Sequence, residues 1–189
     1  MRIYLVTDER LLLGKDLYRT VEAAVKGGVS MVQLREKESS TREFVERAIR
    51  LKEVLTPYGV PLIINDRVDV ALAANADGVH VGQSDMPYEM VKRLLPEGKI
   101  IGLSVESPEQ VLEANNYDLD YVAASPVFST TTKTNTIVEW GLDGLRWIRS
   151  VSRHPLVAIG GIHSNNVASI CKAGADSVAV ISAIVSADD

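Results

Sequence analysis

The sequence has few of the features that mark several other classes of protein. It contains a single cysteine, Cys171, so no intramolecular disulfide can form, and this residue is expected to be a small buried side chain on a helix. No apolar run reaches membrane-spanning length and no signal-peptide core is present, which predicts a cytoplasmic protein. A formal net charge of −5 creates no field that attracts nucleic acid or an anionic membrane. Any phosphate chemistry must therefore rest on a few local cations or a metal.

Histidine is also scarce, and the common motifs of hydrolases are missing. The three histidines, His80, His154 and His163, form no recognisable pair with a serine or cysteine nucleophile. The sequence has no HExxH, CxxC or P-loop spacing. These absences argue against hydrolysis of those kinds, and His80 is expected to be hydrogen-bonded in the wall of the fold.

Short apolar runs alternate with amphipathic segments along the whole chain. The runs contain four to six β-branched or apolar residues, and a polar loop separates each run from the next helical pattern. Eight strands are predicted, near Ile3–Thr7, Met31–Arg35, Leu62–Asn65, Gly78–Val81, Ile100–Ser104, Tyr121–Ala124, Leu156–Ile159 and Ser177–Ile181. Strands that alternate with helices favour a parallel sheet.

The expected architecture is one (β/α)₈ TIM barrel that spans residues 1–189. The clearest helix begins at Ser40, with Glu43 in capping-box spacing and apolar residues repeating at a helical period after it. A doubly wound open sheet stays the alternative, because periodicity alone does not show whether a sheet closes. Only residues 182–189 follow the eighth strand, so the final closing helix is expected to be short or absent.

Polar side chains alternate with apolar ones at the end of the second strand. Gln33, Arg35 and Lys37 share one face, while Val32 and Leu34 share the other. In a barrel, this pattern places the polar set in the mouth and the apolar set against helices. A two-sided edge strand would show the same alternation.

Two carboxylates follow consecutive strands, and they form the most informative pair in the sequence. Asp66 ends the third strand region and Asp85 follows the fourth, so both are expected at one edge of the barrel. Each could be a helix N-cap. As a pair facing Arg35 and Lys37, they suit Mg²⁺, which one or two carboxylates usually hold together with substrate phosphate oxygens.

Two further loops contain groups that suit phosphate. The segment 129–136 after the sixth strand is rich in hydroxyls and has Lys133 as its only cation, which predicts a lid or binding loop, although a plain mobile loop has the same composition. The seventh strand ends in Gly160-Gly161, and the eighth is followed by Ser182. Backbone N–H groups after these two strands often bind phosphate in this fold, but a tight turn would also require the glycines.

Taken together, seven segments resemble the motifs of the thiamine-phosphate synthase family in that family's order. They are Gln33–Lys37, Ile64–Arg67, His80–Asp85, Gly102–Ser104, Ser125–Phe128 with Thr130–Lys133, Ala158–Ile162 and Val180–Ser182. The resemblance covers nearly the whole chain. It implies a Mg²⁺-dependent (β/α)₈ enzyme that joins a pyrimidine diphosphate to a thiazole phosphate and releases pyrophosphate.

The resemblance also assigns roles to residues of this chain. It implies catalytic roles for Arg35, Lys37, Ser104 and Lys133, and metal binding by Asp66 and Asp85. The substrate-binding residues that it implies are Gln33, Leu34, Arg35, Glu36, Lys37, Asn65, Ser104, Thr130, Thr131, Thr132, Lys133, Gly161, Ile181 and Ser182.

Some positions depart from the family, and other functions stay open. Ser129 stands where proline is expected, and Thr134 and Asn135 replace a more charged continuation, although the Thr130–Lys133 core is intact. A thiazole tautomerase of the same barrel type is an alternative, but it typically lacks the paired acids and the lysine. A noncatalytic barrel that binds thiamine precursors is the other. The sequence is compatible with a homo-oligomer and does not determine the oligomeric state.

Overall fold

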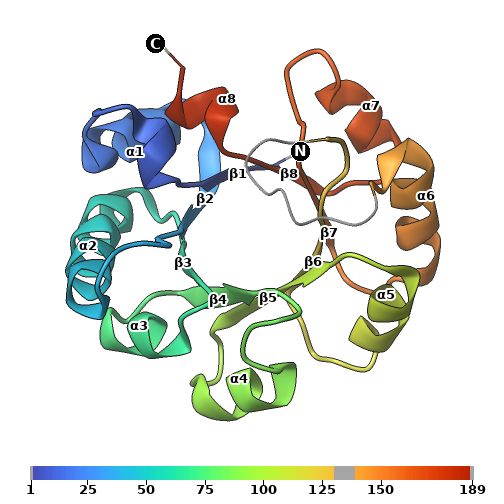
Figure 1. Ribbon diagram of the computed structural model, residues 1–189, viewed down its shortest axis with the longest axis horizontal. Coiled ribbons are helices and arrows are strands. Elements are labelled where there is room, and N and C mark those ends of the chain that lie inside the picture. Colours follow the sequence, from blue (N-terminus) through green and yellow to red (C-terminus); the bar gives the residue numbers. More distant parts are fainter. Residues whose placement is uncertain (1, 130–138, 188–189) are drawn as a thin grey trace.

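The computed structural model describes residues 2–129 and 139–187, and in it eight parallel strands surround a common axis (Figure 1). The strands are β1 (Arg2–Val6), β2 (Val29–Leu34), β3 (Leu62–Asn65), β4 (Gly78–Val81), β5 (Ile100–Val105), β6 (Tyr121–Ala124), β7 (Leu156–Ile159) and β8 (Ser177–Val180). Each lies within about two residues of a predicted strand.

Pairing between the first and last strands closes the sheet. β1 pairs with β2 on one side and with β8 on the other, so that Tyr4 lies opposite both Met31 and Ala179. The remaining strands pair in sequence order. The prediction of a (β/α)₈ barrel is therefore confirmed, and the open doubly wound sheet is excluded.

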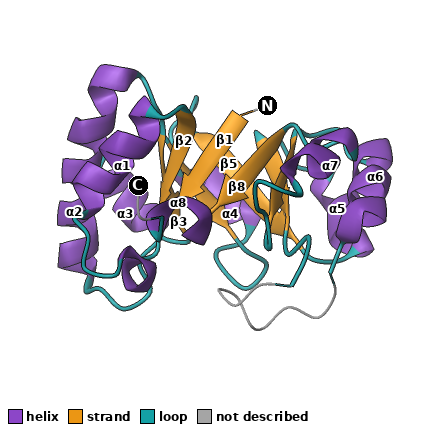
Figure 2. Cartoon of the chain, turned by 90° about the horizontal axis from the view of Figure 1, so that it is seen from above, coloured by secondary structure: helices purple, strands orange, loops and turns teal. Residues whose placement is uncertain are grey.

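Helices surround the barrel, and Figure 2 shows them on the outside of the strands. The α-helices are α1 (Leu17–Lys26), α2 (Thr41–Leu55), α3 (Val68–Ala73), α4 (Tyr88–Leu94), α5 (Pro108–Ala114), α6 (Gly141–Val151), α7 (Val167–Lys172) and α8 (Ser182–Val185). Two 3₁₀ helices, η1 (Glu9–Leu12) and η2 (Thr56–Tyr58), complete the set in the described residues.

Helix α2 forms as its sequence predicts. The Ser40 side chain accepts a hydrogen bond from the Glu43 N–H, and the Glu43 carboxylate accepts one from the Ser40 N–H. The apolar face of α2 buries Phe44, Ala48 and Leu51 in the layer between helices and strands. The capping box and the apolar period therefore act together to fix the start and the orientation of the helix.

The core has two layers, one outside and one inside the barrel. The outer layer includes Val32 and Leu34, which point from β2 toward the helices. The inner cluster includes Ile63 and Tyr121, with Met31 and Ile100 packed against it. These four side chains do not line the cavity at the carboxyl ends of the strands, so they fill the interior beneath it.

The last element, α8, has four residues, which agrees with the prediction of a short closing helix. It packs against η1, and the Ser186 hydroxyl donates a hydrogen bond of 3.0 Å to the Leu11 carbonyl. None of the helices in the described ranges has both the length and the apolar character that a membrane span needs.

Candidate active site

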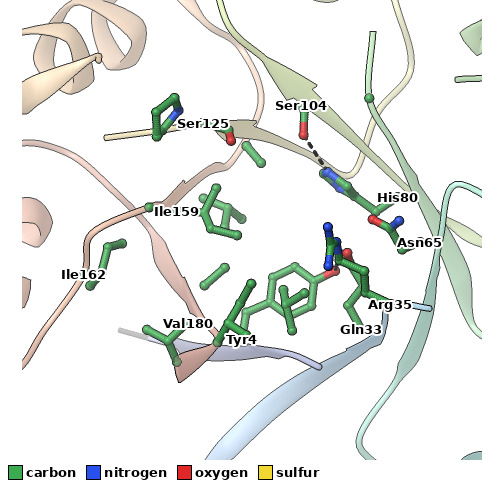
Figure 3. A pocket seen from close by; sticks show the side chains of 18 of the residues that line it. Tyr4, Gln33, Arg35, Asn65, His80, Ser104, Ser125, Ile159, Ile162 and Val180 are labelled. Atoms are coloured by element: carbon green, nitrogen blue, oxygen red, sulfur yellow. Dashed lines mark hydrogen bonds between the residues drawn. The ribbon is translucent and has the colours of Figure 1, made fainter. Parts of the chain in front are cut away.

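A cavity of about 760 Å³ opens at the carboxyl ends of the strands (Figure 3). All eight strands or the loops after them contribute to its lining. This is the end of the barrel at which (β/α)₈ enzymes place their chemistry. Of the predicted site residues, it brings together Gln33, Arg35, Lys37, Asn65, Asp66, Asp85, Ser104, Gly161, Ile181 and Ser182.

Two cations lie at the end of β2. The Arg35 guanidinium is largely buried and donates to the Asp8 carboxylate at 2.7 Å, while the backbone N–H of Arg35 donates to the Thr7 hydroxyl at 3.1 Å. Lys37 is more exposed, and its Nζ lies 2.6 Å from Oδ2 of Asp66. The side chains of Gln33, Arg35 and Lys37 all line the cavity, as their alternation along the strand predicts.

Asp66 and Asp85 stand next to each other at the ends of β3 and β4. Asp66 has a φ of 63°, an uncommon backbone conformation for a residue other than glycine, and its N–H donates to the His80 carbonyl at 2.8 Å. Oδ2 of Asp85 accepts a hydrogen bond of 2.7 Å from the Gly82 N–H. Burial and then the neighbouring Asp66 carboxyl raise the pKa of Asp85.

Neither aspartate is a helix cap. Helix α3 begins after Arg67 and helix α4 after Pro87, and no side chain caps either helix. The capping alternative is therefore excluded for both residues. Two hard oxygen donors beside a cavity fit Mg²⁺, which keeps several waters and takes other ligands from a substrate. No cluster of three or more His, Cys, Asp or Glu side chains that could hold a metal occurs within the described ranges.

A chain of hydrogen bonds crosses the floor of the cavity. Gln33 Nε2 donates to the Tyr4 hydroxyl at 2.6 Å, and the hydroxyls of Tyr4 and Tyr121 are 2.9 Å apart. The Tyr121 hydroxyl lies 3.0 Å from Nδ1 of His80, whose Nε2 lies 2.9 Å from the Ser104 hydroxyl oxygen. Figure 3 shows the His80–Ser104 contact and the position of Tyr4 next to Gln33.

Glycines shape the opposite wall, after β7. Gly160 and Gly161 have φ values of 102° and 62°, which favour glycine. A Cβ atom on Gly160 would come within 2.7 Å of Pro126, and one on Gly161 within 2.8 Å of Phe128. Packing against the segment after β6 is thus a structural reason for both glycines. Ile181 and Ser182, after β8, line the same wall.

Other predicted site residues lie away from the cavity or outside the described part of the chain. Leu34 is fully buried in the outer core. Glu36 points away from the cavity, and its carboxylate accepts from Arg47 at 2.7 Å and from the Ser39 hydroxyl at 2.7 Å. The predictions for Thr130, Thr131, Thr132 and Lys133 fall outside the described residues.

Comparison with known proteins identifies the family. The sequence model of a protein family, thiamine monophosphate synthase, matches residues 3–184. The chain belongs to this family. Membership of the thiamine monophosphate synthase family makes the chain a transferase of thiamine biosynthesis that acts on small molecules.

Individual relatives agree with the family assignment. The thiamine-phosphate synthase of Albidiferax ferrireducens is 52% identical over 189 residues, which cover 100% of this chain and 86% of that protein. The structure of thiamine phosphate pyrophosphorylase from Pyrococcus furiosus has a TM-score of 0.90 at 41% identity and covers 100% of this chain and 89% of its own.

A more distant structure shares only the fold. The N-acetylmannosamine-6-phosphate 2-epimerase of Clostridium perfringens has a TM-score of 0.70 at 15% identity, with 97% of this chain and 87% of that chain covered. The barrel alone therefore does not distinguish the thiamine monophosphate synthase family from an epimerase. The distinction depends on the side chains in the mouth.

Proposed function

We propose that the chain joins 4-amino-2-methyl-5-hydroxymethylpyrimidine diphosphate to 4-methyl-5-(2-hydroxyethyl)thiazole phosphate, giving thiamine phosphate and pyrophosphate with Mg²⁺. The observation that carries this proposal is the grouping of two cations and two carboxylates on one side of a single cavity. Such a grouping suits a diphosphate and its metal. The glycine-rich wall across the cavity leaves room for a second phosphate.

The proposed reaction does not require a nucleophile from the protein. Departure of pyrophosphate leaves a pyrimidinylmethyl cation, which the amino group of the ring stabilises, and the thiazole nitrogen then attacks the exocyclic carbon. The protein must position two substrates and neutralise the charge that develops on the leaving group. Arg35 and Lys37 are placed for the second task, and Arg35 is held in place by Asp8. A similar role for Lys133 and binding by Thr130–Thr132 stay predictions.

Asp66 and Asp85 would hold the metal. When bound, Mg²⁺ supplies positive charge to the departing diphosphate oxygens. The protein's own contribution is to keep both carboxylates at adjacent strand ends, with the Asp85 carboxylate oriented by the Gly82 N–H. Lys37 lies 2.6 Å from Asp66, and its ammonium group can pair with a diphosphate oxygen when the substrate binds.

The thiazole phosphate would occupy the wall formed by Gly161, Ile181 and Ser182. Support for this comes from their place on the cavity lining after β7 and β8 and from the resemblance of the segments that contain them to the family motifs. Gly161, Ile181 and Ser182 have no charged side chain, so they would hold the phosphate by shape and hydrogen bonding rather than by charge. Asn65 and Ser104 line the space between the two walls, where the pyrimidine ring would lie.

A turnover assay tests this function directly. The protein is incubated with both substrates and Mg²⁺, and thiamine phosphate and pyrophosphate are measured in the same samples, with and without excess chelator. Equal amounts of the two products that disappear with chelator are the expected result. Isomerisation of the thiazole phosphate alone would indicate a tautomerase, and binding without product would indicate a noncatalytic barrel. The cytoplasmic location and a homo-oligomeric state stay predictions.

A further inference from the structure

The hydrogen-bonded chain across the cavity floor links two side chains that face the ring-binding space. Gln33 and Ser104 form its ends and line the cavity, while Tyr4, Tyr121 and His80 connect them. The three connecting residues are all buried, and Tyr121 lies beneath the cavity without lining it. Tyr121 is therefore placed to act on a ligand only through its neighbours.

The number of hydrogens on these five side chains restricts the directions in which their hydrogen bonds can run. Burial raises the pKa of Tyr4 and of Tyr121, so both phenols stay neutral and each has one hydrogen to donate. If Tyr4 donates to Tyr121, then Tyr121 donates to Nδ1 of His80, and an imidazole with a single ring N–H donates from Nε2 to Ser104. In the opposite arrangement every one of these donors becomes an acceptor.

The two arrangements present different groups to the cavity. In the first, one hydrogen of the Gln33 NH₂ group is donated to Tyr4, the Gln33 carbonyl oxygen accepts no hydrogen bond from these side chains, and Ser104 offers its O–H. In the second, the Gln33 amide is turned and offers N–H, while the Ser104 O–H is used on His80 and the oxygen offers lone pairs. The amide orientation and the imidazole tautomer thus change together.

We infer that this chain of five side chains is a relay that makes the cavity floor select a ring with one hydrogen-bond donor and one acceptor. The inference rests on the proposed function and deepens it, because the 4-aminopyrimidine ring has an amino donor and ring-nitrogen acceptors. A ring that presents an acceptor to each end leaves the Gln33 carbonyl oxygen without a donor in the first arrangement and meets a Ser104 oxygen that has no hydrogen to donate in the second. Tyr121 is in this sense a positioning residue for specificity.

The test compares two ligands and five forms of the protein. The ligands are the 4-amino pyrimidine diphosphate and its 4-methoxy counterpart, whose substituent only accepts hydrogen bonds. Dissociation constants are measured by titration calorimetry with Mg²⁺ and without the thiazole phosphate. The variants are Tyr121→Phe, Tyr4→Phe and the double variant, and Tyr58→Phe, which removes a hydroxyl from a surface contact with Glu22, serves as the control.

The wild type and Tyr58→Phe should prefer the amino ligand. Either single variant should lower that preference by about tenfold to a hundredfold, because the two ends become free to change independently. The double variant should lower it no further than the larger single effect, since one break already interrupts a relay.

Several outcomes would overturn the relay. They are no preference in the wild type, an unchanged preference in both single variants, or a double variant whose loss equals the product of the two single losses. Wild-type turnover, measured in parallel, separates the two proposals. Turnover with an unaltered preference rejects the relay alone, whereas absence of both turnover and binding rejects the proposed function and the relay with it.

Discussion

Asp85 has a proposed role in metal binding, and its position raises the pKa of its own carboxyl group. Its carboxylate is partly buried beside the Asp66 carboxylate, and both effects disfavour the ionised form of Asp85, while Lys37 opposes them in part. Asp85→Asn or Asp66→Asn should lower turnover at least about a hundredfold, because a neutral amide does not hold Mg²⁺ against its hydration shell. Product formation at saturating Mg²⁺ measures this. Near-normal turnover in both variants would contradict the metal assignment.

The same residue should give an unusual dependence of stability on pH. Because the folded-state pKa of Asp85 is raised, its contribution to stability is complete below the unfolded pKa and is lost as pH rises through the folded pKa. Asp85→Asn removes that loss. The variant should therefore gain in melting temperature over the wild type on going from acid to neutral pH, in metal-free buffer.

Asp69 provides a control of opposite sign. Its pKa is lowered, first by hydrogen bonds from Arg67, so it contributes stability above the unfolded pKa that is lost as pH falls. Asp69→Asn should lower the melting temperature slightly at neutral pH and leave turnover unchanged. If both asparagine variants shifted the melting temperature in the same direction with pH, the electrostatic account of Asp85 would be wrong.

The two walls of the cavity can be probed with one residue each. Lys37→Gln removes a cation on the β2 side and should raise the KM for the pyrimidine diphosphate by about tenfold, the value of one charge-assisted hydrogen bond. Ser182→Asp places a negative charge after β8 and should raise the KM for the thiazole phosphate by about tenfold or more through repulsion. Ser182→Asn is the neutral control.

Initial rates with each substrate varied in turn provide this comparison. Equal effects of Lys37→Gln and Ser182→Asp on both substrates would mean that the phosphates share one site. Gly161 is less suitable as a probe of this wall, because any side chain there would collide with Phe128 and the Ser129 carbonyl and disturb the fold. Arg35 is likewise complicated by Asp8, which its removal would leave buried without its partner.

At the scale of elements, an ionic cluster holds the loop after β2 against helix α2. Arg47 of α2 pairs with Glu36 at 2.7 Å and with Glu9 at 2.9 Å, and the Glu36 side chain is only 3% exposed. Arg47→Ala should lower the free energy of unfolding by about 1–3 kcal/mol, because it leaves a buried carboxylate without its cation. Chemical denaturation measures the change.

Two further variants make this test specific. Glu36→Gln in the Arg47→Ala background should recover part of the stability, because the buried group is then neutral. Arg42→Ala, on an exposed part of the same helix, should change the free energy of unfolding by less than about 0.5 kcal/mol. An Arg47→Ala variant as stable as Arg42→Ala would show that the cluster contributes nothing.

The sequence predicts most helices and strands because apolar runs, turn residues and capping residues act over a few neighbouring positions. Apolar runs bounded by turn residues locate all eight strands, and the Ser40–Glu43 spacing locates the start of α2. The alternation of Gln33, Arg35 and Lys37 places all three in the cavity for the same reason. Strict alternation also assigns Glu36 to the opposite face, where it pairs with Arg47, although the family motif includes it among the binding residues.

The polar floor could not be predicted in this way. Tyr4 and Tyr121 lie in strands that are mostly apolar, and nothing local shows that their hydroxyls meet although 117 positions separate them in the sequence. The contact arises only when β1 and β6 face each other inside a closed barrel. The best available signal was the period of two, which places Tyr4 on the same face of β1 as Val6, another residue of the cavity lining.

At the scale of the whole molecule, apolar side chains of the described residues pack inside the barrel beneath the cavity. Ile63, Met31, Ile100 and Tyr121 fill the barrel beneath the cavity, so solvent reaches the floor through the mouth. A second substrate in the mouth would lie between the reacting carbon and bulk water. The packed interior should therefore affect how often the proposed pyrimidinylmethyl cation reacts with water rather than with the thiazole.

The ratio of pyrimidine alcohol to thiamine phosphate among the products measures this competition. At fixed pyrimidine diphosphate, the fraction converted to the simple alcohol by water should fall as the thiazole phosphate concentration rises, and should approach zero at saturation. Ile63→Ala, which opens space beneath the floor, should retain a measurable fraction of alcohol at saturation, while Leu34→Ala, in the outer core, should not. If this result is obtained, the packing at the closed end of the barrel sets the chemical yield, because it limits how much activated pyrimidine is lost to solvent.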